Sequence, residues 1–477
     1  MERERVIALF QEEGMLIQPE AVDFLISRGD AIVTARKILQ KMREKPLILS
    51  IDDIKNALRE DEKSETREVY VEDGEVEIEI IKDVTGKSRS EGKITDFAKL
   101  FRDRYERISE MLSRRQELKN VVPLRRVQRM SGEISVIGIV NEIRRGENGS
   151  VIEIEDESDV ATCYLPLDLS ASTPIVEDEV LGIIGKVGKR GLIIAQNIVR
   201  PDISFNRERN YSDKEAYVAF VSDIHIGSKT FLKKEWREFI KWLNGEIGNA
   251  RQREVAKKVK CIVIPGDIVD GIGIYPNQEE DLEIMDFYDQ YRALAKEMEG
   301  LPEHIKIIFQ PGNHDAVRAP LPQPALEKDI QDIFSSFNAL FVGNPCFLKI
   351  DGVEILLYHG QAIQDFATHA AMDQNKPTEI MKAMLQMRHM APIYGDNTPL
   401  SPEIHDYLVI DRVPDIFVTG HVHVTAVEKY RGVLLINAST WQSQTEYQKM
   451  MNFSPDPAKV PLVNLKNCQA TVMDFGS

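Results

Sequence analysis

The chain has 477 residues, more than one ordinary hydrophobic core organises, so its length predicts about two to four domains. Hydrophobic residues make up 43% and charged residues 29%, and no apolar run approaches the roughly 18 to 20 residues of a membrane span, which argues against a membrane protein. The net charge of -17 excludes a protein that coats nucleic acid by basic charge alone, because such binding depends on neutralising phosphates with Lys and Arg.

The N-terminal region is expected to be a small helical domain over 1–60. Its first residues, "MERERVIALFQEEG", carry acids and no small-residue cleavage site, so no secretion signal is expected and the protein should stay in the cytoplasm. Apolar residues recur at helical spacing, and Ser50 followed by Asp53 indicates a helix start. The apolar positions are Val6, Ile7, Phe10, Ala21, Phe24 and Leu25.

An acidic segment, a helix and a group of short strands follow. Residues 61–93 are rich in acids and predict a flexible linker, although "EVEIEII" within it could form a strand. A helix is expected over 94–120. Five strands with Gly-containing turns over 121–200 predict a small barrel of the OB type. Tyr164 is its only stacking aromatic, so an architectural role is favoured over binding of single strands.

From residue 214 onward, apolar strands alternate with helical patterns, which predicts a layered α/β domain over 214–477. The fold class expected for the chain is therefore α/β and multidomain, with a small helical domain and an OB-type barrel before the α/β domain. All candidate catalytic residues fall in this last region.

Several strands of this domain end in side chains that bind metals. In "YVAFVSDIHIGS", Asp223 and His225 are two residues apart and point to the same side of the chain. Each motif alone has an ordinary explanation as turn chemistry or a structural histidine. Together they contain five of the nine histidines, which favours one metal site. The further motifs are "GDIVD" (Asp267, Asp270), "GNHD" (Asn313, His314), "YHG" (His359) and "GHVH" (His421, His423).

The types of side chain predict the chemistry. Oxygen and imidazole ligands without thiolates suit manganese first, with iron or zinc as alternatives, and their number is sufficient for two divalent ions that share one carboxylate. The four cysteines are scattered without a CxxC pair, which argues against a zinc ribbon or a redox dithiol. A pair of divalent ions can polarise a phosphoryl group and generate hydroxide from water. The expected reaction is phosphoester hydrolysis.

The order D-x-H, GDxxD, GNHD, H, GHxH resembles the calcineurin-like metallophosphoesterase family over residues 215 to 445. The resemblance implies one ion held by Asp223, His225, Asp267 and His423. It implies a second ion held by Asp267, Asn313, His359 and His421. His314 would be the general acid that protonates the leaving oxygen, and Asp270 would orient the His314 ring.

The order of the domains, with the stretches at 387–403 and 440–465, resembles the small subunits of archaeal family-D DNA polymerases. This resemblance implies a 3'-5' proofreading exonuclease within a two-subunit replicative polymerase. The implied partners are a large catalytic subunit, DNA with a single-stranded or mismatched 3' end, and a sliding clamp reached through the complex. Two alternatives stay open: a stand-alone metallophosphatase or cyclic-nucleotide phosphodiesterase, and a non-catalytic polymerase scaffold.

The segment 376–394 is a further candidate. It combines basic residues with a Met-rich helix, and Met-rich surfaces adapt to partners. It is interpreted either as an ordinary surface helix and loop or as a contact with DNA or another subunit. The residues predicted to make such a contact are Arg388, His389 and Tyr394.

Overall fold

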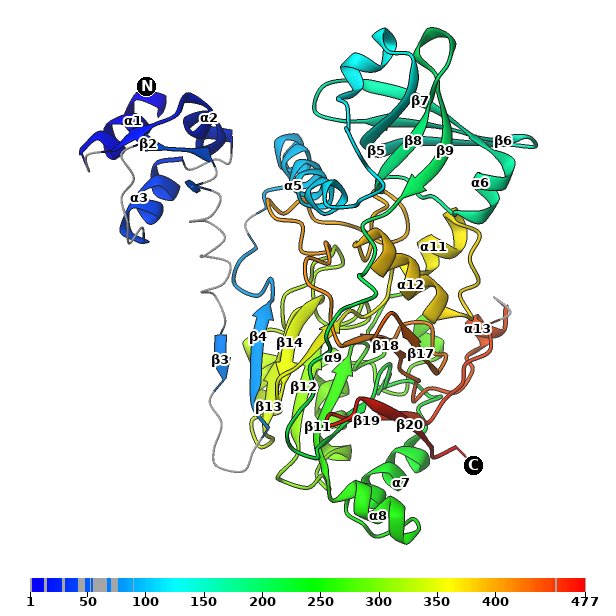
Figure 1. The fold of residues 1–477 in the computed structure, drawn as a ribbon. Coiled ribbons are helices and arrows are strands. Elements are labelled where there is room, and N and C mark those ends of the chain that lie inside the picture. The colour runs from blue at the N-terminus through cyan, green and yellow to red at the C-terminus, as the bar shows by residue number, and fades with distance from the viewer. Residues whose placement is uncertain are drawn as a thin grey trace. The chain divides into compact units, whose positions relative to one another are not determined.

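The computed structural model describes residues 2–12, 15–27, 31–41, 48–51, 53–54, 67–69, 76–88, 90–450 and 453–476 (Figure 1). The chain divides into two compact units, Met1–Glu68 and Val69–Ser477. Among the residues that the structure describes, no helix combines the length and the hydropathy needed to span a lipid bilayer.

The described part of the first unit is mainly helical. It contains α1 (Glu2–Glu12), β1 (Leu16–Ile17), α2 (Pro19–Ser27), α3 (Ala31–Lys41) and β2 (Ile48–Leu49). The apolar positions that predicted helices form its core, where Val6 and Phe10 of α1 pack with Ala21 and Leu25 of α2. β1 and β2 pair in parallel, a contact that the sequence did not predict. The predicted boundary at residue 60 lies outside the described residues.

The helix start predicted at Ser50 is present as reciprocal hydrogen bonds. The backbone N–H of Ser50 donates to Asp53 Oδ2 at 2.9 Å, and the backbone N–H of Asp53 donates to Ser50 Oγ at 3.2 Å. This exchange satisfies two backbone donors that have no partner in the first turn of a helix. β3 (Arg67–Val69) follows at the boundary of the two units.

The predicted linker 61–93 contains a sheet strand. β4 (Ile78–Lys82) pairs antiparallel with β14 (Cys346–Ile350). Its alternate residues Ile78 and Ile80 are buried between two sheets, because the period-two pattern of "EVEIEII" places the isoleucines on one face. The linker prediction is therefore wrong for the described residues from 76 onward, where burial of the apolar face outweighs the acidic composition. Residues 61–66 and 70–75 lie outside the described part of the chain.

The helix predicted over 94–120 is α5 (Ile94–Ser113), which ends earlier than expected. Residues 114–120 turn away from the helix and carry Leu118 into the interior. Gly182 of the barrel makes room for this side chain, since a Cβ on Gly182 would lie 2.5 Å from Leu118 Cδ1. Packing against the barrel therefore ends the helix at Ser113, where the local sequence favours its continuation.

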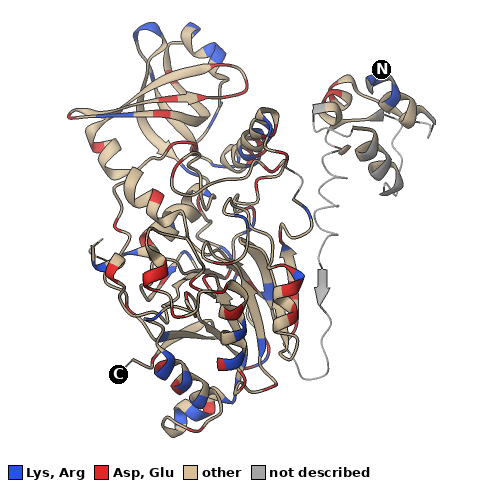
Figure 2. Ribbon diagram, turned by 180° about the vertical axis from the view of Figure 1, so that it is seen from behind, with Lys and Arg blue, Asp and Glu red and all other residues tan. Residues whose placement is uncertain are grey.

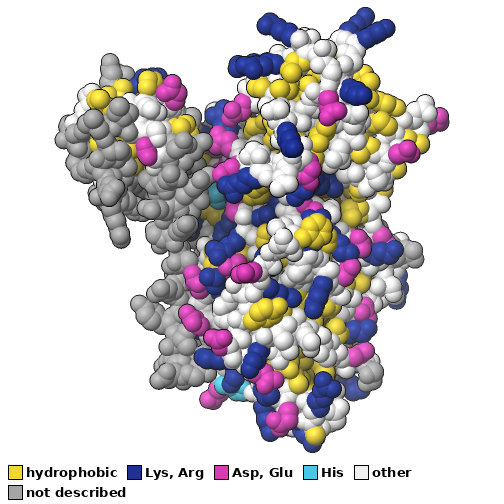
Figure 3. Space-filling model, viewed as in Figure 1, with side chains coloured by type: hydrophobic (Ala, Val, Ile, Leu, Met, Phe, Trp, Pro, Cys, Tyr) yellow, Lys and Arg dark blue, Asp and Glu magenta, His cyan; other side chains and the backbone are white. Residues whose placement is uncertain are grey.

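The five strands predicted over 121–200 form a closed barrel in the order β5-β6-β7-β9-β8. They are β5 (Gly132–Gly146), β6 (Gly149–Glu155), β7 (Val160–Pro166), β8 (Val180–Val187) and β9 (Ile193–Val199). The short helix α6 (Leu167–Ser172) follows β7, and the 3-10 turns η1 (Leu124–Arg129) and η2 (Lys189–Gly191) lie together at one end. Figure 3 shows Lys and Arg side chains that project from the barrel. Those exposed on the two turns are Arg125, Arg126, Arg129, Lys189 and Arg190.

The remaining strands form two sheets. The first has the order β13-β12-β11-β10-β19-β20, and the second contains β17-β18-β16-β15-β14-β4 as consecutive neighbours. The strands of the first sheet are β10 (Tyr217–Phe220), β11 (Val259–Pro265), β12 (Lys306–Gln310), β13 (Ala339–Phe341), β19 (Lys459–Asn464) and β20 (Gln469–Asp474). The further strands of the second sheet are β15 (Val353–Leu357), β16 (Ile416–Thr419), β17 (Ala426–Tyr430) and β18 (Val433–Asn437).

The two sheets pack face to face, with helices on both outer faces (Figure 1). The first sheet is covered by α7 (Lys233–Leu243), α8 (Ala250–Ala256), α9 (Phe287–Glu297) and α10 (Lys328–Ile333). The second is covered by α11 (Ile363–His369) and α12 (Pro377–Met387), and α13 (Glu446–Met450) follows β18. Figure 2 shows acidic and basic residues mixed over these layers. The mixed α/β architecture expected for this part of the chain is confirmed, but the second sheet also contains β4 from before residue 214.

Strand direction brings the predicted motifs together. In the first sheet, β10, β11 and β12 are parallel neighbours, and in the second, β15 and β16 are parallel neighbours. The carboxyl ends of parallel strands lie at one edge of a sheet, where ligands bind in α/β folds. Each of these five strands is followed directly by one of the metal-ligand motifs, so the motifs meet at this edge of the stacked sheets.

Candidate metal centre

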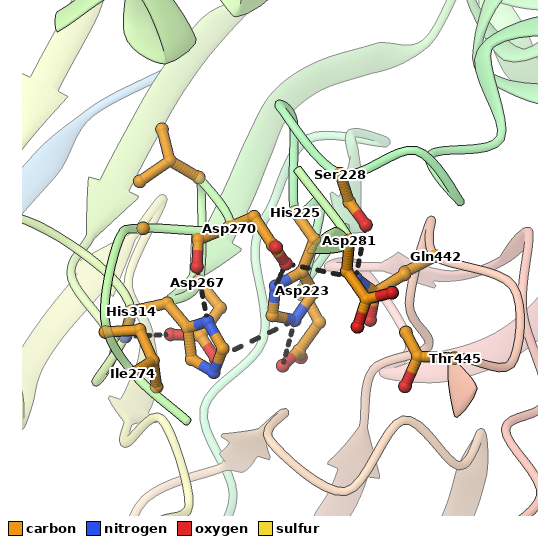
Figure 4. A network of polar contacts seen from close by, with 12 residues as sticks. Asp223, His225, Ser228, Asp267, Asp270, Ile274, Asp281, His314, Gln442 and Thr445 are labelled. Atoms are coloured by element: carbon orange, nitrogen blue, oxygen red, sulfur yellow. Dashed lines mark hydrogen bonds and ion pairs between the residues drawn. The ribbon is translucent and has the colours of Figure 1, made fainter. Parts of the chain in front are cut away.

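The structure brings all seven predicted ligands into one polar cluster at this edge. Figure 4 shows part of this cluster, with the ligands Asp223, His225 and Asp267. Among the described residues, three groups have ligand atoms within 4.8 Å of one another. They are Asp223 with His225 and His423, Asp267 with His359 and His421, and His225 with Asp267 and His314. Asn313 joins the second group through its side-chain oxygen, which lies 3.2 Å from His359 Nε2.

The residues of the first group come from two loops, Asp223 and His225 from the loop after β10 and His423 from the loop after β16. His225 Nε2 and His423 Nε2 lie 3.1 Å apart, and His423 Nε2 lies 3.3 Å from Asp223 Oδ1. Imidazole ligands of zinc bind at about 2.0 to 2.1 Å, so nitrogens that share one such ion lie a little over 3 Å apart. Both carboxylate oxygens of Asp223 also accept the backbone N–H of His421, at 2.9 and 3.1 Å. The spacing fits one ion between these side chains.

Asp267 connects the first group with the second. Its Oδ1 accepts the backbone N–H of His314 at 2.9 Å, which fixes the carboxylate. Its Oδ2 lies 3.2 Å from His359 Nε2 and 3.9 Å from His225 Nε2. One carboxylate oxygen therefore faces imidazoles of both groups, as a bridging ligand requires. The ring of His359 is oriented by its Nδ1, which lies 2.9 Å from the carbonyl oxygen of Pro265.

The backbone at the site is held in a conformation that non-glycine residues rarely adopt. Five ligand residues have positive φ angles between 49° and 68°. Such angles cost free energy in L-residues and cluster at functional sites. The residues are Asp223, His225, Asp267, His421 and His423. These angles turn the chain sharply at the strand ends and direct the side chains of neighbouring motifs toward one another.

The glycines of the motifs allow this crowding. A Cβ on Gly312, in "GNHD", would lie 2.2 Å from Asp267 Oδ1. A Cβ on Gly266, in "GDIVD", would lie 2.2 Å from His359 Nδ1. Any side chain at these two positions would therefore displace a ligand, which explains why glycine precedes the ligand residues in these motifs.

One buried nitrogen of the site has no partner. His421 Nε2 is inaccessible to solvent and makes no hydrogen bond, although buried polar atoms are nearly always satisfied. His421 belongs to the group with Asp267 and His359, so a carboxylate and a second imidazole lie close to its ring. A divalent ion would satisfy this nitrogen, and the set of carboxylate, imidazole and amide ligands suits such an ion. The residues therefore fit the metals that the motifs predict.

The electrostatics of the site favour a cation. Burial raises the pKa of Asp267, but the imidazoles of His359 and His314 hold it well below its usual range. Burial lowers the pKa of His225 and His359, but the carboxylates of Asp270 and Asp267 reverse the shift and raise both to about 9. Among the described residues, no Lys or Arg forms an ion pair with these carboxylates. The carboxylates are thus ionised and depend on imidazolium or metal for compensation.

Asp270 does not act as the resemblance implies. Its Oδ1 lies 3.0 Å from Nδ1 of the ligand His225, whereas Nδ1 of His314 lies 2.7 Å from the backbone carbonyl oxygen of Asp270. The carboxylate therefore orients His225, and the carbonyl orients His314. The prediction that the Asp270 side chain positions the general acid is corrected on this point, because the turn after β11 presents its carbonyl, not its side chain, to His314.

His314 lies at the edge of the cluster and is less buried than most of the ligands. Its Nε2 faces the centre, 3.9 Å from Asp267 Oδ2, and its ring packs edge-on against His225 with the centroids 4.7 Å apart. Burial lowers its pKa. The position allows either a proton-transfer role or coordination, so the predicted role of His314 stays a prediction.

Three residues that support the ligands were missed by the sequence analysis. Gln442 Nε2 donates to Asp270 Oδ1 at 3.0 Å, and Gln448 Nε2 lies 3.1 Å from Nδ1 of His423. Both glutamines lie in the 440–465 stretch, where no local pattern marks them. Asp315 could have been identified from the sequence, because it is the last residue of the "GNHD" motif.

Asp315 joins the loops that follow β11 and β12. Its carboxylate accepts the backbone N–H groups of Gly312 at 2.9 Å and Ile268 at 3.2 Å, and the hydroxyl of Tyr291 at 2.9 Å. Burial raises its pKa to about 6. This buried carboxylate therefore holds two ligand-bearing loops in register.

Arg388 and His389 lie in the interior of the protein, and not at the surface as a contact with DNA or another subunit would require. Arg388 is buried, and its Nε and Nη2 donate to the carbonyl oxygens of Ile410 and Asp411, each at 2.7 Å. His389 Nε2 lies 2.9 Å from Asp406 Oδ2. The contact prediction is wrong for these two residues, because the left-handed turn at Arg388 directs both side chains inward.

We call the cluster of Arg104, His389 and Asp406 the α5 latch. Arg104 is fully buried on α5, and its Nε donates to Asp406 Oδ2 at 2.8 Å. The latch therefore ties α5 to the loop after α12. Tyr394 is 43% exposed and packs its ring against Phe97 and Phe101 of α5, so its predicted contact stays a prediction.

The chain is similar to small subunits of DNA polymerases. The family model for the DNA polymerase alpha/epsilon B-subunit matches residues 218–427, so this region is similar to those polymerase subunits. The DNA polymerase II small subunit of Archaeoglobus fulgidus is 40% identical over 94% of this chain and 94% of its own length. That of Methanocaldococcus jannaschii is 44% identical over 82% of this chain and 67% of its own length. The chain belongs to the family of DNA polymerase II small subunits, the small subunits of archaeal family-D polymerases.

Among solved structures, an archaeal phosphodiesterase covers 54% of this chain and 98% of its own length. It is 15% identical and has a TM-score of 0.28. The family assignment rests on the sequence relatives alone.

Proposed function

We propose that this chain carries a metal-dependent 3'-5' exonuclease that removes nucleotides from single-stranded or mismatched 3' ends for its polymerase. One observation carries the proposal: the Asp267 carboxylate faces imidazoles of both ligand groups, and His421, which has a buried nitrogen without a partner, belongs to the group of Asp267 and His359. A subunit retained only as a scaffold has no need of a buried, electrostatically unbalanced cluster, which is costly without a ligand.

The residues that would hold two divalent ions are those of the two groups. Asp223, His225 and His423 would bind one ion and Asn313, His359 and His421 the other, with Asp267 shared. Bound ions would supply Lewis acidity toward the phosphate and activate water near neutral pH. Manganese is our first choice, with iron or zinc as alternatives.

The protein groups would then act on the phosphodiester as follows. The oxygen of a water molecule loses a proton to solvent and forms a bond to phosphorus, and the bond between phosphorus and the O3' of the preceding nucleotide breaks. His314 donates its Nε2 proton to that O3', while its Nδ1–H stays bound to the carbonyl of Asp270. The anionic substrate favours the imidazolium form that this transfer needs, which offsets the effect of burial on the His314 pKa.

We also propose the types of the two domains and the binding partners of the chain. We assign the barrel to the OB type on its closed five-strand order and the double-sheet domain to the calcineurin-like phosphoesterases on its motif-bearing strand ends. A large catalytic subunit would be the partner, with DNA and, through the complex, a sliding clamp as further contacts. The exposed basic residues of η1 and η2 support a contact with DNA despite the negative net charge.

One assay separates this proposal from its alternatives. The purified chain, alone and with its large subunit, is stripped with chelator and offered single-stranded DNA, a mismatched primer-template and p-nitrophenyl phosphate, with and without Mn²⁺. We expect Mn²⁺-dependent shortening of both DNA substrates from the 3' end. Hydrolysis of p-nitrophenyl phosphate alone would indicate a stand-alone phosphatase, no hydrolysis would indicate a scaffold, and DNA cleavage after exhaustive chelation would contradict the two-metal mechanism.

A further inference from the structure

Two tyrosines stack on each other beside the metal centre. Tyr275, in the loop after β11, and Tyr447, on α13, have ring centroids 5.2 Å apart and an angle of 22° between their planes. Tyr275 is fixed by its hydroxyl, which donates to Asp281 Oδ2 at 3.0 Å. Tyr447 remains 42% exposed, so it presents ring surface to solvent with Tyr275 stacked against it.

Both tyrosines belong to segments that touch the ligand cluster. In the loop of Tyr275, Gln278 Nε2 donates to the carbonyl oxygen of Asp270 at 2.8 Å. Next to Tyr447, Gln448 Nε2 contacts Nδ1 of His423 at 3.1 Å. The two tyrosines therefore lie in segments that contact the ligand cluster, one through Gln278 and the other through Gln448.

Exposed aliphatic side chains extend this surface toward His314. Ile272 and Ile274 are 44% and 39% exposed. A Cβ on Gly271 would lie 2.5 Å from the carbonyl oxygen of His314 and 3.1 Å from Ile274 Cγ1, so Ile274 and His314 flank the same glycine. Figure 4 shows Ile274 beside His314. We call Ile272, Ile274, Tyr275 and Tyr447 the apolar rim. Exposed apolar side chains gathered at a polar site indicate a binding surface.

The same loop repels phosphates. Glu279, Glu280 and Glu283 follow Tyr275 closely and are exposed. Lys229 Nζ donates to the backbone carbonyl oxygen of Glu280 at 2.6 Å. A duplex presents mainly phosphates to a protein surface, whereas a single strand presents the faces of its bases, which stack on aromatic rings without regard to sequence.

We propose that the apolar rim binds the unpaired bases at the 3' end of a DNA strand, with Tyr447 as the stacking platform and Tyr275 as its support. The carboxylates of Glu279, Glu280 and Glu283 would repel the phosphates of a base-paired 3' end at the apolar rim. This inference rests on the proposed exonuclease function and names the residues that would select unpaired over paired ends. Tyr447 acts here in substrate positioning and does not take part in the chemistry.

The test uses the full chain and three oligonucleotides of one sequence. One is single-stranded, one lacks the bases of its last three nucleotides, and one is annealed as a blunt duplex. All carry phosphorothioate linkages that resist hydrolysis, and binding is followed by fluorescence anisotropy with Mn²⁺ present. The variants are Tyr447→Ala and Tyr447→Phe, and the control is Tyr211→Ala. Tyr211 is 52% exposed and follows Asn210, which binds Asp415 at the amino end of β16, the opposite end from His421.

We expect Tyr447→Ala to weaken binding of the single strand about tenfold, the effect of losing one base stack. Binding of the abasic strand and of the duplex should stay unchanged, and Tyr447→Phe and Tyr211→Ala should bind like the wild type. The inference is overturned if Tyr447→Ala still prefers the strand with bases, or if it weakens binding of the abasic strand equally. Binding is measured without cleavage, so a chain that lacks exonuclease activity would contradict the proposed function and leave this test intact.

Discussion

The metal centre and the α5 latch are both buried clusters of histidine and aspartate, yet they differ in how their charge is compensated. In the latch, Asp406 is paired with the guanidinium of Arg104, and His389 completes the contact. In the metal centre, the carboxylates of Asp223 and Asp267 face imidazoles, and among the described residues no Lys or Arg pairs with them. Burial of such residues therefore does not by itself indicate a functional site.

The backbone shows the same difference. Five ligand residues of the metal centre have positive φ angles, whereas Asp406 and His389 of the latch have ordinary φ angles. Strained backbone angles and buried carboxylates without a Lys or Arg partner both cost free energy. A bound cation would compensate for this cost by neutralising the carboxylates. The comparison predicts that damage to the metal centre affects chemistry and that damage to the latch affects stability.

The largest effect is expected for Asp267→Ala. Removing the shared carboxylate takes a ligand from both ions, so bound metal should fall and the single-turnover exonuclease rate should drop by about 1,000-fold or more. Metal analysis of the purified variant and rapid-quench rates measure both. Asp332→Ala, at an exposed position of α10, is the control and should behave as the wild type. Retention of both ions in Asp267→Ala would show that this carboxylate is not the bridge.

His314→Ala tests the division of roles within the same cluster. A lost general acid costs about 100-fold to 10,000-fold in rate, and the metals should stay bound. Polymerisation by the two-subunit complex should continue while mismatched 3' ends are no longer trimmed. Metal content and single-turnover rates are measured on one preparation. A variant that loses its metals would place His314 among the ligands, as its proximity to His225 and Asp267 allows.

Arg104→Met should be the most damaging change in the latch. It leaves the buried carboxylate of Asp406 without its guanidinium, and breaking a buried ion pair costs about 3 to 5 kcal/mol of stability. Chemical denaturation measures the free energy of unfolding. Arg114→Met is the matched control, because its exposed ion pair with Glu110 on the same helix is worth about 1 kcal/mol or less. Equal effects of the two substitutions would contradict the structural role of the latch.

The latch should also make stability depend on pH. Burial and the neighbouring Arg104 lower the pKa of His389 to about 4, below its unfolded value of about 6.5. The neutral ring contributes its full stabilisation above pH 6.5 and loses it as the pH falls toward 4. The free energy of unfolding should therefore be about 2 kcal/mol lower at pH 5 than at pH 7. Unfolding at both pH values, compared between wild type and His389→Gln, isolates this contribution. An identical pH dependence in the two proteins would mean that His389 does not titrate in this way.

The smallest effect is expected for Asp270→Asn, which sharpens the corrected role of Asp270. Its carboxylate orients the ligand His225, and losing such a support costs about 10-fold to 100-fold in metal affinity. Calorimetric titration with Mn²⁺ measures the affinity, and Asp332→Asn is the control. A lower rate with unchanged metal affinity would instead favour the role that the family resemblance implied, with the Asp270 side chain orienting His314.

Much of the candidate site was predictable because its ligands are local features. Asp223, Asp267 and His359 each follow an apolar strand within three residues, and glycine beside them signals a crowded turn. The supports were not predictable in this way. Gln442 and Gln448 reach the ligands from a distant segment whose residue types carry no pattern, so only the folded chain shows their contacts.

The sequence by itself determined which side chains could bind metal, the five barrel strands and the layered α/β architecture, because hydrophobic periodicity and strand-end motifs are encoded over short stretches. Tertiary structure alone decided that β4 completes a sheet, that α5 ends at Ser113 and that Arg388 and His389 are buried. Each of these depends on a partner more than 60 residues away: β14 for β4, Gly182 for Leu118, and α5 for the loop that carries His389. Local composition favours a linker, a longer helix and a basic surface, and packing against distant residues overrides all three.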